Sequence, residues 1–217
     1  MPSNHSIHPT PSNDNALTDT APADNIDMND VTHFLLELDA LKRVNRRSYV
    51  TQTTRRENSA EHSWHLAMAC WSVAELFALD VNHEQLLKMA LVHDLGEIDA
   101  GDTFLYDNTR HTAHIEERQG MARLQAERGN GIANLAAVWE AQETGDSKEA
   151  QLLRVVDRLL PFLLNLNTNG QTWIELGVTR SQVAGAHAFI KDSFPPIHDW
   201  LSQRIDYATK QGWLIDA

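Results

Sequence analysis

The stretch LLKMALVHDLGEIDAGDT, residues 86 to 103, joins an apolar run to a concentration of charge. The run up to Val92 has the pattern of a helix that packs into a protein core. Directly after it come His93 and four carboxylates, those of Asp94, Glu97, Asp99 and Asp102. Buried carboxylates are costly unless a positive group compensates them. This cluster therefore marks either a helix that ends at a wet surface or a site that holds a cation.

From residue 30 onward, the pattern on both sides of this stretch is helical almost throughout. Asp30 can cap a first helix over residues 31–44, in which apolar side chains recur at helical spacing. Asn58 and Glu61 have the spacing of a capping box. They open a helix to about residue 79 that is apolar nearly all round, as expected of a central, buried helix. Further helices are expected at 82–98, 111–128, 131–144, 147–167, 179–192 and 196–212.

These patterns predict an all-α fold, a single globular helical domain over residues 30–217, because strand alternation over four or more residues is absent. The first thirty residues hold four prolines, five aspartates and no lysine or arginine. They also lack the basic start and the apolar stretch of a signal peptide. We therefore expect residues 1–29 to be a disordered acidic tail.

Composition limits the partners of the chain. Its 217 residues carry a formal net charge of -12, which repels phosphate backbones, so duplex nucleic acid is not an expected partner. No stretch approaches the ~18 to 20 consecutive apolar residues of a membrane-spanning helix, so we expect no membrane insertion. The single cysteine, Cys70, lies in an apolar run. It predicts a reducing, cytoplasmic location and a core position for its own side chain.

Polar side chains interrupt three of the predicted apolar helices. His62 begins one helix, the His93-Asp94 pair ends another, and Asp157 stands among leucines and valines in LLRVVDRLL. Each alone has an ordinary explanation, such as a hydrogen bond in the core or an ion pair with a nearby arginine. Together, two imidazoles and two carboxylates can form a mixed nitrogen and oxygen site for Mn²⁺, Co²⁺, Fe²⁺ or Zn²⁺.

The order His62, His93-Asp94, Asp157 resembles the H…HD…D signature of the HD superfamily of metal-dependent phosphohydrolases. From about residue 41 to 160 the chain is similar to the branch that contains the 5'-deoxynucleotidases and HD-domain-containing protein 2. The segments that carry this similarity are LKRVNRR, RRENSAEHS, LLKMALVHDLGEIDAGDT and LLRVVDRLL. The resemblance implies an HD-domain helical bundle whose four signature side chains hold a divalent metal: Mn, Co, Mg, Fe or Zn.

The same resemblance implies catalytic roles for two further acids. Glu97 corresponds to the acid of HDxxE, which acts on the attacking water. Asp102 corresponds to the acid of the following GD, which lies near the substrate sugar or a second cation. The spacing supports the first role independently, since Glu97 follows His93 by four residues and would share its face of a continuous helix.

Four arginines precede the first histidine of the signature. Arg46, Arg47, Arg55 and Arg56 lie in the polar segment 45–57, which we expect to be a loop. A guanidinium group matches a phosphate with two parallel hydrogen bonds, so these arginines are candidate substrate-binding residues. The alternative is a solvated charge run paired with surface acids. The family places tryptophan in this segment, whereas this chain has Ser48 and Tyr49, so its base preference is expected to differ.

The predicted function is a metal-dependent phosphomonoesterase that converts (deoxy)nucleoside 5'-monophosphates to nucleoside and phosphate. One alternative is an HD-type phosphodiesterase or nucleotide pyrophosphohydrolase with a second metal, for which His111 and His114 are the first candidate ligands. Another is a non-catalytic nucleotide-binding HD domain. His65, one turn after His62, is an alternative ligand to it. A homodimer is expected from the paired helices.

Overall fold

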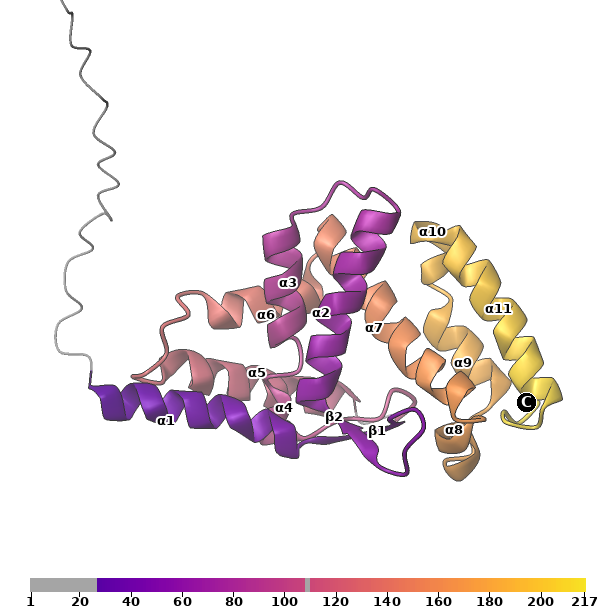
Figure 1. Cartoon of the computed structure of the whole chain (residues 1–217), viewed down its shortest axis with the longest axis horizontal. Helices are drawn as coiled ribbons and strands as arrows, with labels where there is room; N and C mark the ends of the chain where they lie inside the picture. The colour runs from indigo at the N-terminus through magenta and orange to yellow at the C-terminus, as the bar shows by residue number, and fades with distance from the viewer. Residues whose placement is uncertain (1–26, 108–109) are drawn as a thin grey trace, which may run out of the picture.

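The computed structural model describes residues 27–107 and 110–217, except for the side chains of residues 110 and 111. Over these residues the chain is a helical bundle with one two-stranded sheet (Figure 1). The predicted all-α helical fold is therefore confirmed. Of the predicted acidic tail, residues 1–26 lie outside the described part of the chain. None of the described helices combines the length and the apolar character needed to cross a membrane.

The elements follow one another without a long crossover. Their bounds are α1 Met28–Asp39, the 3-10 helix η1 Ala40–Arg43, β1 Asn45–Tyr49, β2 Arg56–Asn58, α2 Ser59–Leu76, α3 His83–Val92, α4 Glu97–Ala100, α5 Arg110–Ala126, α6 Leu135–Thr144, α7 Lys148–Asn167, α8 Gln171–Glu175, α9 Arg180–His187, α10 Ile190–Ser193 and α11 Pro195–Lys210. In Figure 1, α2 and α3 lie at the centre, α1 runs along the lower edge, and α9 to α11 form the right-hand end.

Local capping sets the start of the first two long helices. The side chain of Asp27 accepts a hydrogen bond from the Asn29 amide and caps α1, so this helix starts at Met28 and not after Asp30 as predicted. At α2 the predicted capping box is present. The Asn58 side chain accepts from the Glu61 amide at 2.9 Å, and the Glu61 carboxylate accepts from the Asn58 amide at 3.2 Å.

The segment 45–57 is a β-hairpin and not the predicted loop. β1 and β2 pair antiparallel, Asn45 opposite Asn58 and Tyr49 opposite Arg56, with an irregular register between them. The strands are short, and their polar sequence shows no alternation that would mark them as strands. Contacts with α8 support the hairpin, because the Thr172 hydroxyl donates to the Arg47 carbonyl at 2.9 Å.

The predicted helix 82–98 is divided into α3 and α4. α3 ends at Val92, and tight turns follow, in which the Leu95 amide donates to the Val92 carbonyl and the Glu97 amide to the Asp94 carbonyl. The polypeptide then resumes as α4 at Glu97. His93 and Glu97 are therefore not one turn apart on a continuous α-helix. The prediction that Glu97 shares a helix face with His93 is therefore wrong. The turn between α3 and α4 sets the position of Glu97 relative to His93.

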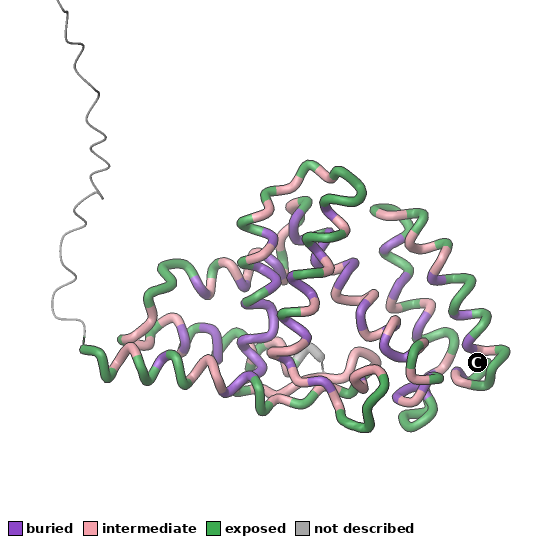
Figure 2. The backbone as a smooth tube through the Cα atoms, in the orientation of Figure 1, coloured by how far each residue is buried: buried purple, intermediate pink, exposed green. Residues whose placement is uncertain are grey.

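The core consists of three adjoining clusters. The first lies between α2, α3 and α7 and contains Leu66 and Leu153. The second joins α7 to the elements after it and contains Phe162 and Trp173. The third packs α1 against α5 and α6 around Trp139. Many residues of α7 are buried (Figure 2), and this helix contributes to two of the clusters, so it connects the two ends of the molecule.

One face of α2 is exposed, contrary to the prediction of a helix buried all round. The inward face packs Leu66 and Cys70 into the core, where the thiol of Cys70 is fully buried as expected. The outward face presents Trp64, Met68 and Trp71, with exposed fractions of 65%, 45% and 45%. These three side chains recur at i, i+4 and i+7 and so form one apolar stripe along the helix.

Candidate metal centre and active site

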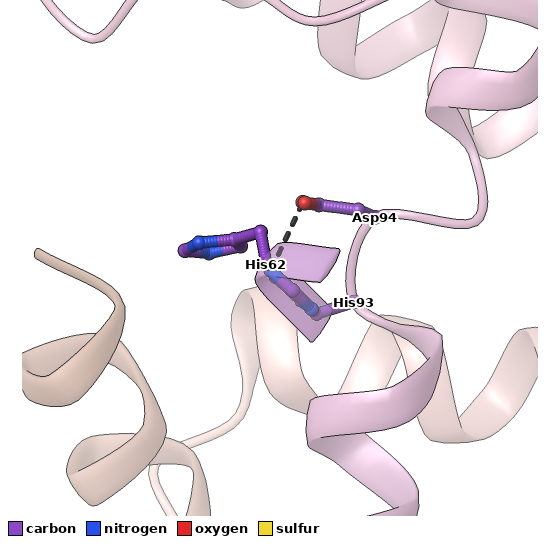
Figure 3. Close-up of side chains that lie close together, drawn as sticks. All are labelled: His62, His93 and Asp94. Atoms are coloured by element: carbon purple, nitrogen blue, oxygen red, sulfur yellow. Dashed lines mark ion pairs between the residues drawn. The ribbon is translucent and has the colours of Figure 1, made fainter. Parts of the chain in front are cut away.

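Four side chains from three parts of the chain meet beside the first turn of α2. His62 comes from α2, His93 and Asp94 from the turn after α3, and Asp157 from α7. Nε2 of His62 lies 3.0 Å from Oδ1 of Asp157, and Nε2 of His93 lies 3.0 Å from Oδ1 of Asp94. Ligand atoms of His62, His93 and Asp94 all lie within 4.8 Å of one another (Figure 3). The structure thus brings together the four side chains of the signature.

The donor atoms of this cluster fit a divalent cation. Nδ1 of His93 lies 2.9 Å from the Ala90 carbonyl, and this contact holds a proton on Nδ1, so Nε2 is the ring nitrogen that faces the cluster and can bind a cation when it is deprotonated. That Nε2 is buried and has no hydrogen-bond partner, despite the nearby Asp94 oxygen. Neutral imidazole and carboxylate together suit a first-row divalent metal. An ion bound there would satisfy the orphaned nitrogen.

The electrostatics of the cluster favour positive charge. Burial lowers the pKa of His93, but the adjacent Asp94 carboxylate outweighs burial and raises this pKa to about 9. Burial raises the pKa of Asp94, but His93 and Arg46 outweigh it and lower this pKa to about 2. Against burial, the hydrogen bond from His62 and the charge of Arg158 hold the pKa of Asp157 well below its usual range. Both carboxylates are therefore ionised at neutral pH, as metal ligands must be.

Glu97 is a buried carboxylate at the edge of this cluster. The hydroxyl of Ser59, the first residue of α2, donates to Oε2 of Glu97 at 2.6 Å. Burial first, and then the charge of Asp94, raise the pKa of Glu97 well above its ordinary value. A carboxylate whose pKa is raised is a stronger proton acceptor than an ordinary one, which is the property a general base needs. Sequence reasoning missed Ser59, although the capping box already identified it as the first residue of α2.

Arg46 joins the cluster from β1. Its Nη1 donates to Oδ2 of Asp94 at 2.7 Å and lies 3.7 Å from Oδ1 of Asp102. Burial lowers the pKa of Arg46, but the surrounding carboxylates, Asp94 foremost, reverse this effect and raise it. Burial is also the main cause that raises the pKa of Asp102. Arg46 and Asp102 therefore lie together beside the cluster of His62, His93, Asp94 and Asp157.

The other three arginines of the hairpin separate into two groups. Arg47 lines the cavity above the cluster. Arg55 is exposed and donates to both carboxylate oxygens of Glu61, at 2.7 and 2.8 Å. Arg56 donates to Glu175 at 3.0 Å and lies over the Tyr49 ring. Neither Arg55 nor Arg56 is among the residues that line the cavity, so the structure does not support them as phosphate ligands. Their surface carboxylate partners hold them outside it.

A cavity of about 400 Å³ opens over the cluster. Its lining includes Arg154 and Arg158, two arginines of α7 that sequence reasoning considered only as ion-pair partners of Asp157. Arg158 indeed donates to Oδ2 of Asp157 at 3.0 Å. The signal was present in the sequence, because residues 154, 157, 158, 161 and 165 recur at helical spacing and form one face of α7. Phe104 and Tyr106 supply apolar lining.

The remaining histidine candidates lie apart from the cluster. His114 lines the cavity together with Glu117 and Glu143, and its Nδ1 lies 3.4 Å from a Glu143 oxygen. Burial, and then Glu143, raise the pKa of Glu117. His65 is absent from the described lining and from the ligand cluster. The side chain of His111 lies outside the described residues.

Comparison with other proteins agrees with this geometry. The HD domain family matches residues 38–198. The 5'-deoxynucleotidase HDDC2 of Danio rerio is 30% identical over 135 residues, 61% of this chain and 66% of that protein. The protein of the same name from Homo sapiens is 27% identical over 128 residues, 58% of this chain and 61% of that protein. The match thus spans just under two thirds of these relatives' own length.

Solved structures show the same arrangement of helices. A crystal structure of a predicted metal-dependent phosphohydrolase from Magnetospirillum magnetotacticum is 33% identical, covers 88% of this chain and all of that chain, and has a TM-score of 0.76. A protein of Pyrococcus horikoshii, 19% identical with a TM-score of 0.57 over 79% of this chain and 98% of its own, shares the fold alone. With the family match over residues 38–198 and the histidine and aspartate cluster in place, the chain belongs to the HD domain family.

Proposed function

We propose that the protein is a metal-dependent phosphomonoesterase that releases phosphate from small nucleoside 5'-monophosphates, deoxynucleotides preferred. One observation carries this proposal: an orphaned imidazole nitrogen of His93, in a cluster with His62, Asp94 and Asp157, faces a cavity lined by arginines. The deoxynucleotidase relatives and the phosphohydrolase structure support the same chemistry. The preference for deoxynucleotides rests on Asp102, which matches the acid that the family places near the sugar.

In the proposed reaction, His62, His93, Asp94 and Asp157 hold the divalent ion, which when bound supplies Lewis-acid activation of water and of a phosphoryl oxygen. Glu97 accepts a proton from the attacking water, since its raised pKa makes it a stronger base than an ordinary carboxylate. Ser59 fixes the orientation of that carboxylate by its 2.6 Å hydrogen bond.

Positive charge for the phosphoryl group comes from cavity arginines. Arg46, Arg47 and Arg158 all line the cavity, and two of them also pair with carboxylates, Arg46 with Asp94 and Arg158 with Asp157. A guanidinium there stabilises the charge that develops on the phosphoryl oxygens. The doubly charged end of a monoester matches several arginines better than the single charge of a diester does. We therefore propose Arg46, Arg47 and Arg158 as the phosphate-binding residues.

Base selection is proposed to be loose. Ser48 lines the cavity, where the family places a tryptophan nearby, and Tyr49 is engaged outside it by hydrogen bonds to Glu175. Aromatic side chains from another segment, Phe104 and Tyr106, line the cavity instead. Contact with aromatic side chains discriminates poorly among bases, since every base has a π-face.

One alternative has a specific observation behind it. His114, Glu117 and Glu143 line the same cavity and offer nitrogen and oxygen ligands, as a two-metal phosphodiesterase would need. However, no described cluster there brings three ligand atoms together as His62, His93 and Asp94 do. A phosphomonoesterase with one tightly held ion is therefore the better-supported function. The non-catalytic alternative leaves the buried Glu97 without a purpose.

A substrate panel tests the proposal. The metal-free protein is supplied in turn with Mn²⁺, Co²⁺, Mg²⁺, Fe²⁺ and Zn²⁺, and released phosphate is measured with ribo- and deoxynucleoside 5'-monophosphates, triphosphates and a cyclic dinucleotide. The expected result is phosphate release from the monophosphates that Asp157→Asn abolishes. Faster hydrolysis of the cyclic dinucleotide would instead support the two-metal alternative, and no hydrolysis with any metal would support a binding-only domain.

We further propose that two copies of the chain pair through the apolar stripe of α2, Trp64, Met68 and Trp71. Exposed apolar stripes of this kind are typical of protein interfaces. Light scattering after size exclusion should give a dimer for the natural chain and a monomer for Trp64→Glu. A monomeric natural chain would refute this proposal. The cytoplasmic location expected from the lone Cys70 stays a prediction.

A further inference from the structure

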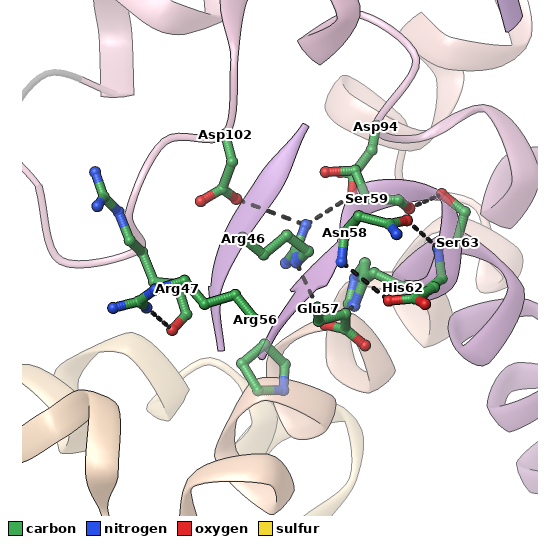
Figure 4. Close-up of polar contacts among 12 residues, drawn as sticks. Arg46, Arg47, Arg56, Glu57, Asn58, Ser59, His62, Ser63, Asp94 and Asp102 are labelled. Atoms are coloured by element: carbon green, nitrogen blue, oxygen red, sulfur yellow. Dashed lines mark hydrogen bonds and ion pairs between the residues drawn. The ribbon is translucent and has the colours of Figure 1, made fainter. Parts of the chain in front are cut away.

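Besides Nε2 of His93, three buried atoms near the cluster have no hydrogen-bond partner, and they lie next to one another. They are Nε of Arg46, Oε2 of Glu57 and Nδ1 of His62. Oε2 of Glu57 lies 3.7 Å from the arginine nitrogen and 3.5 Å from the histidine nitrogen. Figure 4 shows Glu57 below Arg46 and beside His62. Two donors and one acceptor that each lack a partner elsewhere therefore share one small space.

The chemistry of His62 explains what Glu57 is for. Nε2 of His62 faces Asp157 and the ligand cluster, so a neutral ring that binds a cation there must carry its proton on Nδ1. That N–H is buried and points toward the Glu57 carboxylate. Histidines that bind metals usually donate their second N–H to a carboxylate or a carbonyl, which fixes the tautomer and the ring orientation. His93 has the Ala90 carbonyl for this purpose, and His62 has Glu57.

Glu57 is placed for this role by β2. The strand lies between the hairpin turn and α2, and it holds the Glu57 side chain inward with an exposed fraction of 4%. The flanking Arg56 and Asn58 side chains make contacts elsewhere, with Glu175 and within the capping box. A buried carboxylate without a partner is costly, so its persistence here requires the two positive or donor groups beside it.

The same carboxylate orients Arg46. A guanidinium carries five N–H donors in a rigid fork. Nη1 of Arg46 faces Asp94 and Asp102, and Nε faces Glu57, so the carboxylates hold the group from two directions. Oε2 of Glu57 thus lies close to a side-chain nitrogen of both Arg46 and His62.

We infer that Glu57 is a positioning residue that fixes the metal-binding tautomer of His62 and the orientation of Arg46. This inference rests on the proposed metal site. According to this inference, Glu57 affects both the binding of the cation and the binding of phosphate by Arg46. Loss of the acid weakens both interactions, whereas loss of a surface acid weakens neither.

The test is metal binding, measured apart from activity. The full-length protein is stripped of metal and titrated calorimetrically with Co²⁺, as the natural chain, Glu57→Gln and Glu57→Ala. We expect the affinity to fall about 10-fold for Gln and up to about 100-fold for Ala, the usual range for partners of metal-binding histidines. Visible absorption of the Co²⁺-loaded proteins should change in both variants, because the ligand field depends on the orientation of His62.

Glu61→Gln is the matched control. Glu61 lies four residues later, its side chain is 39% exposed, and glutamine preserves the capping box. Its Co²⁺ affinity should equal that of the natural chain. Inhibition by inorganic phosphate should weaken in the Glu57 variants and not in this control, because Arg46 loses its orientation only in the former.

The outcomes separate the inference from the proposed function. A natural chain that binds no Co²⁺ would overturn both. Tight binding by the natural chain and equally tight binding by both Glu57 variants would overturn the inference alone. A lower melting temperature of the metal-free variants with unchanged Co²⁺ affinity would mean that Glu57 only supports the fold, and would also overturn it. Weaker binding and an altered spectrum, with glutamine milder than alanine, is the expected result.

Discussion

The raised pKa of His93 predicts that metal binding depends steeply on pH. In the metal-free protein Asp94 raises this pKa to about 9, so a proton occupies the ring at neutral pH. A cation can bind Nε2 only after that proton leaves, and the two compete. Between pH 6.5 and 8.5 the fraction of deprotonated ring, and with it the apparent affinity, should rise roughly 80-fold for a pKa of about 9.

Isothermal titration with Mn²⁺ measures this effect. At each pH the titration is repeated in two buffers with different ionisation enthalpies, and the difference gives the number of protons released. We expect about one proton per ion at pH 7. A chelator titrated under the same conditions corrects for hydrolysis of the ion. The same affinity at pH 6.5 and 8.5, with no proton released, would refute the reasoning and show that His93 is already neutral.

The stability of the metal-free protein should follow the opposite trend. The pKa of His93 is raised above its ordinary value of 6.5, so its contribution is fully present below about pH 6.5 and is lost as the pH rises through 9. A shift of this size corresponds to about 3 kcal/mol at most. Urea unfolding of the metal-free protein at pH 6.5 and 9 should show the decrease, and unchanged stability would contradict it.

Three further predictions concern single side chains. Glu97→Gln should retain metal and lower turnover about 10²-fold, as loss of a general base usually does; an unchanged kcat would remove Glu97 from the mechanism. Arg46→Ala should raise KM or lower kcat, whereas Arg55→Ala, which loses only a surface pair with Glu61, should match the natural enzyme in steady-state kinetics. Gly96→Ala should destabilise the fold by about 1 to 3 kcal/mol in urea unfolding, because the added Cβ would lie 2.8 Å from Glu117; equal stability would show that α5 yields freely.

The parts of the fold that can be predicted from the sequence are those stabilised by interactions between residues close together in the chain. The α2 capping box is an example, since Asn58 and Glu61 satisfy each other's amides wherever the helix packs. The hairpin 45–58 was missed for the opposite reason. Its strands are short and polar, and the groups that hold it, Thr172 and Glu175 on α8, are more than a hundred residues away.

The candidate site shows the same limit. His62 and Asp157 stand out because charged or polar side chains inside apolar helices need a reason to be there. Ser59 and Glu57 could not be recognised from the sequence, since their roles depend on contacts with residues far away in the chain. The break at His93 was also hidden. The helical pattern continues to Ile98, but Gly96 allows α5 to approach closely, and the chain turns there.

Pro161 gives α7 a consequence for access to the cavity. Proline lacks the amide that would bond to the carbonyl of Asp157 four residues earlier, so the helix is weakest one turn after that residue. On both sides of the proline, however, α7 packs into the same two clusters. Leu153 and Leu163 pack with α2 and α3, and Val155 and Phe162 pack with the C-terminal helices. Bending at Pro161 would disrupt both clusters, so the packed core should keep α7 straight enough to act as a rigid wall of the cavity. Methyl relaxation dispersion at Leu160 should therefore be as small in the natural chain as in Pro161→Ala, and a large dispersion that the substitution suppresses would contradict this.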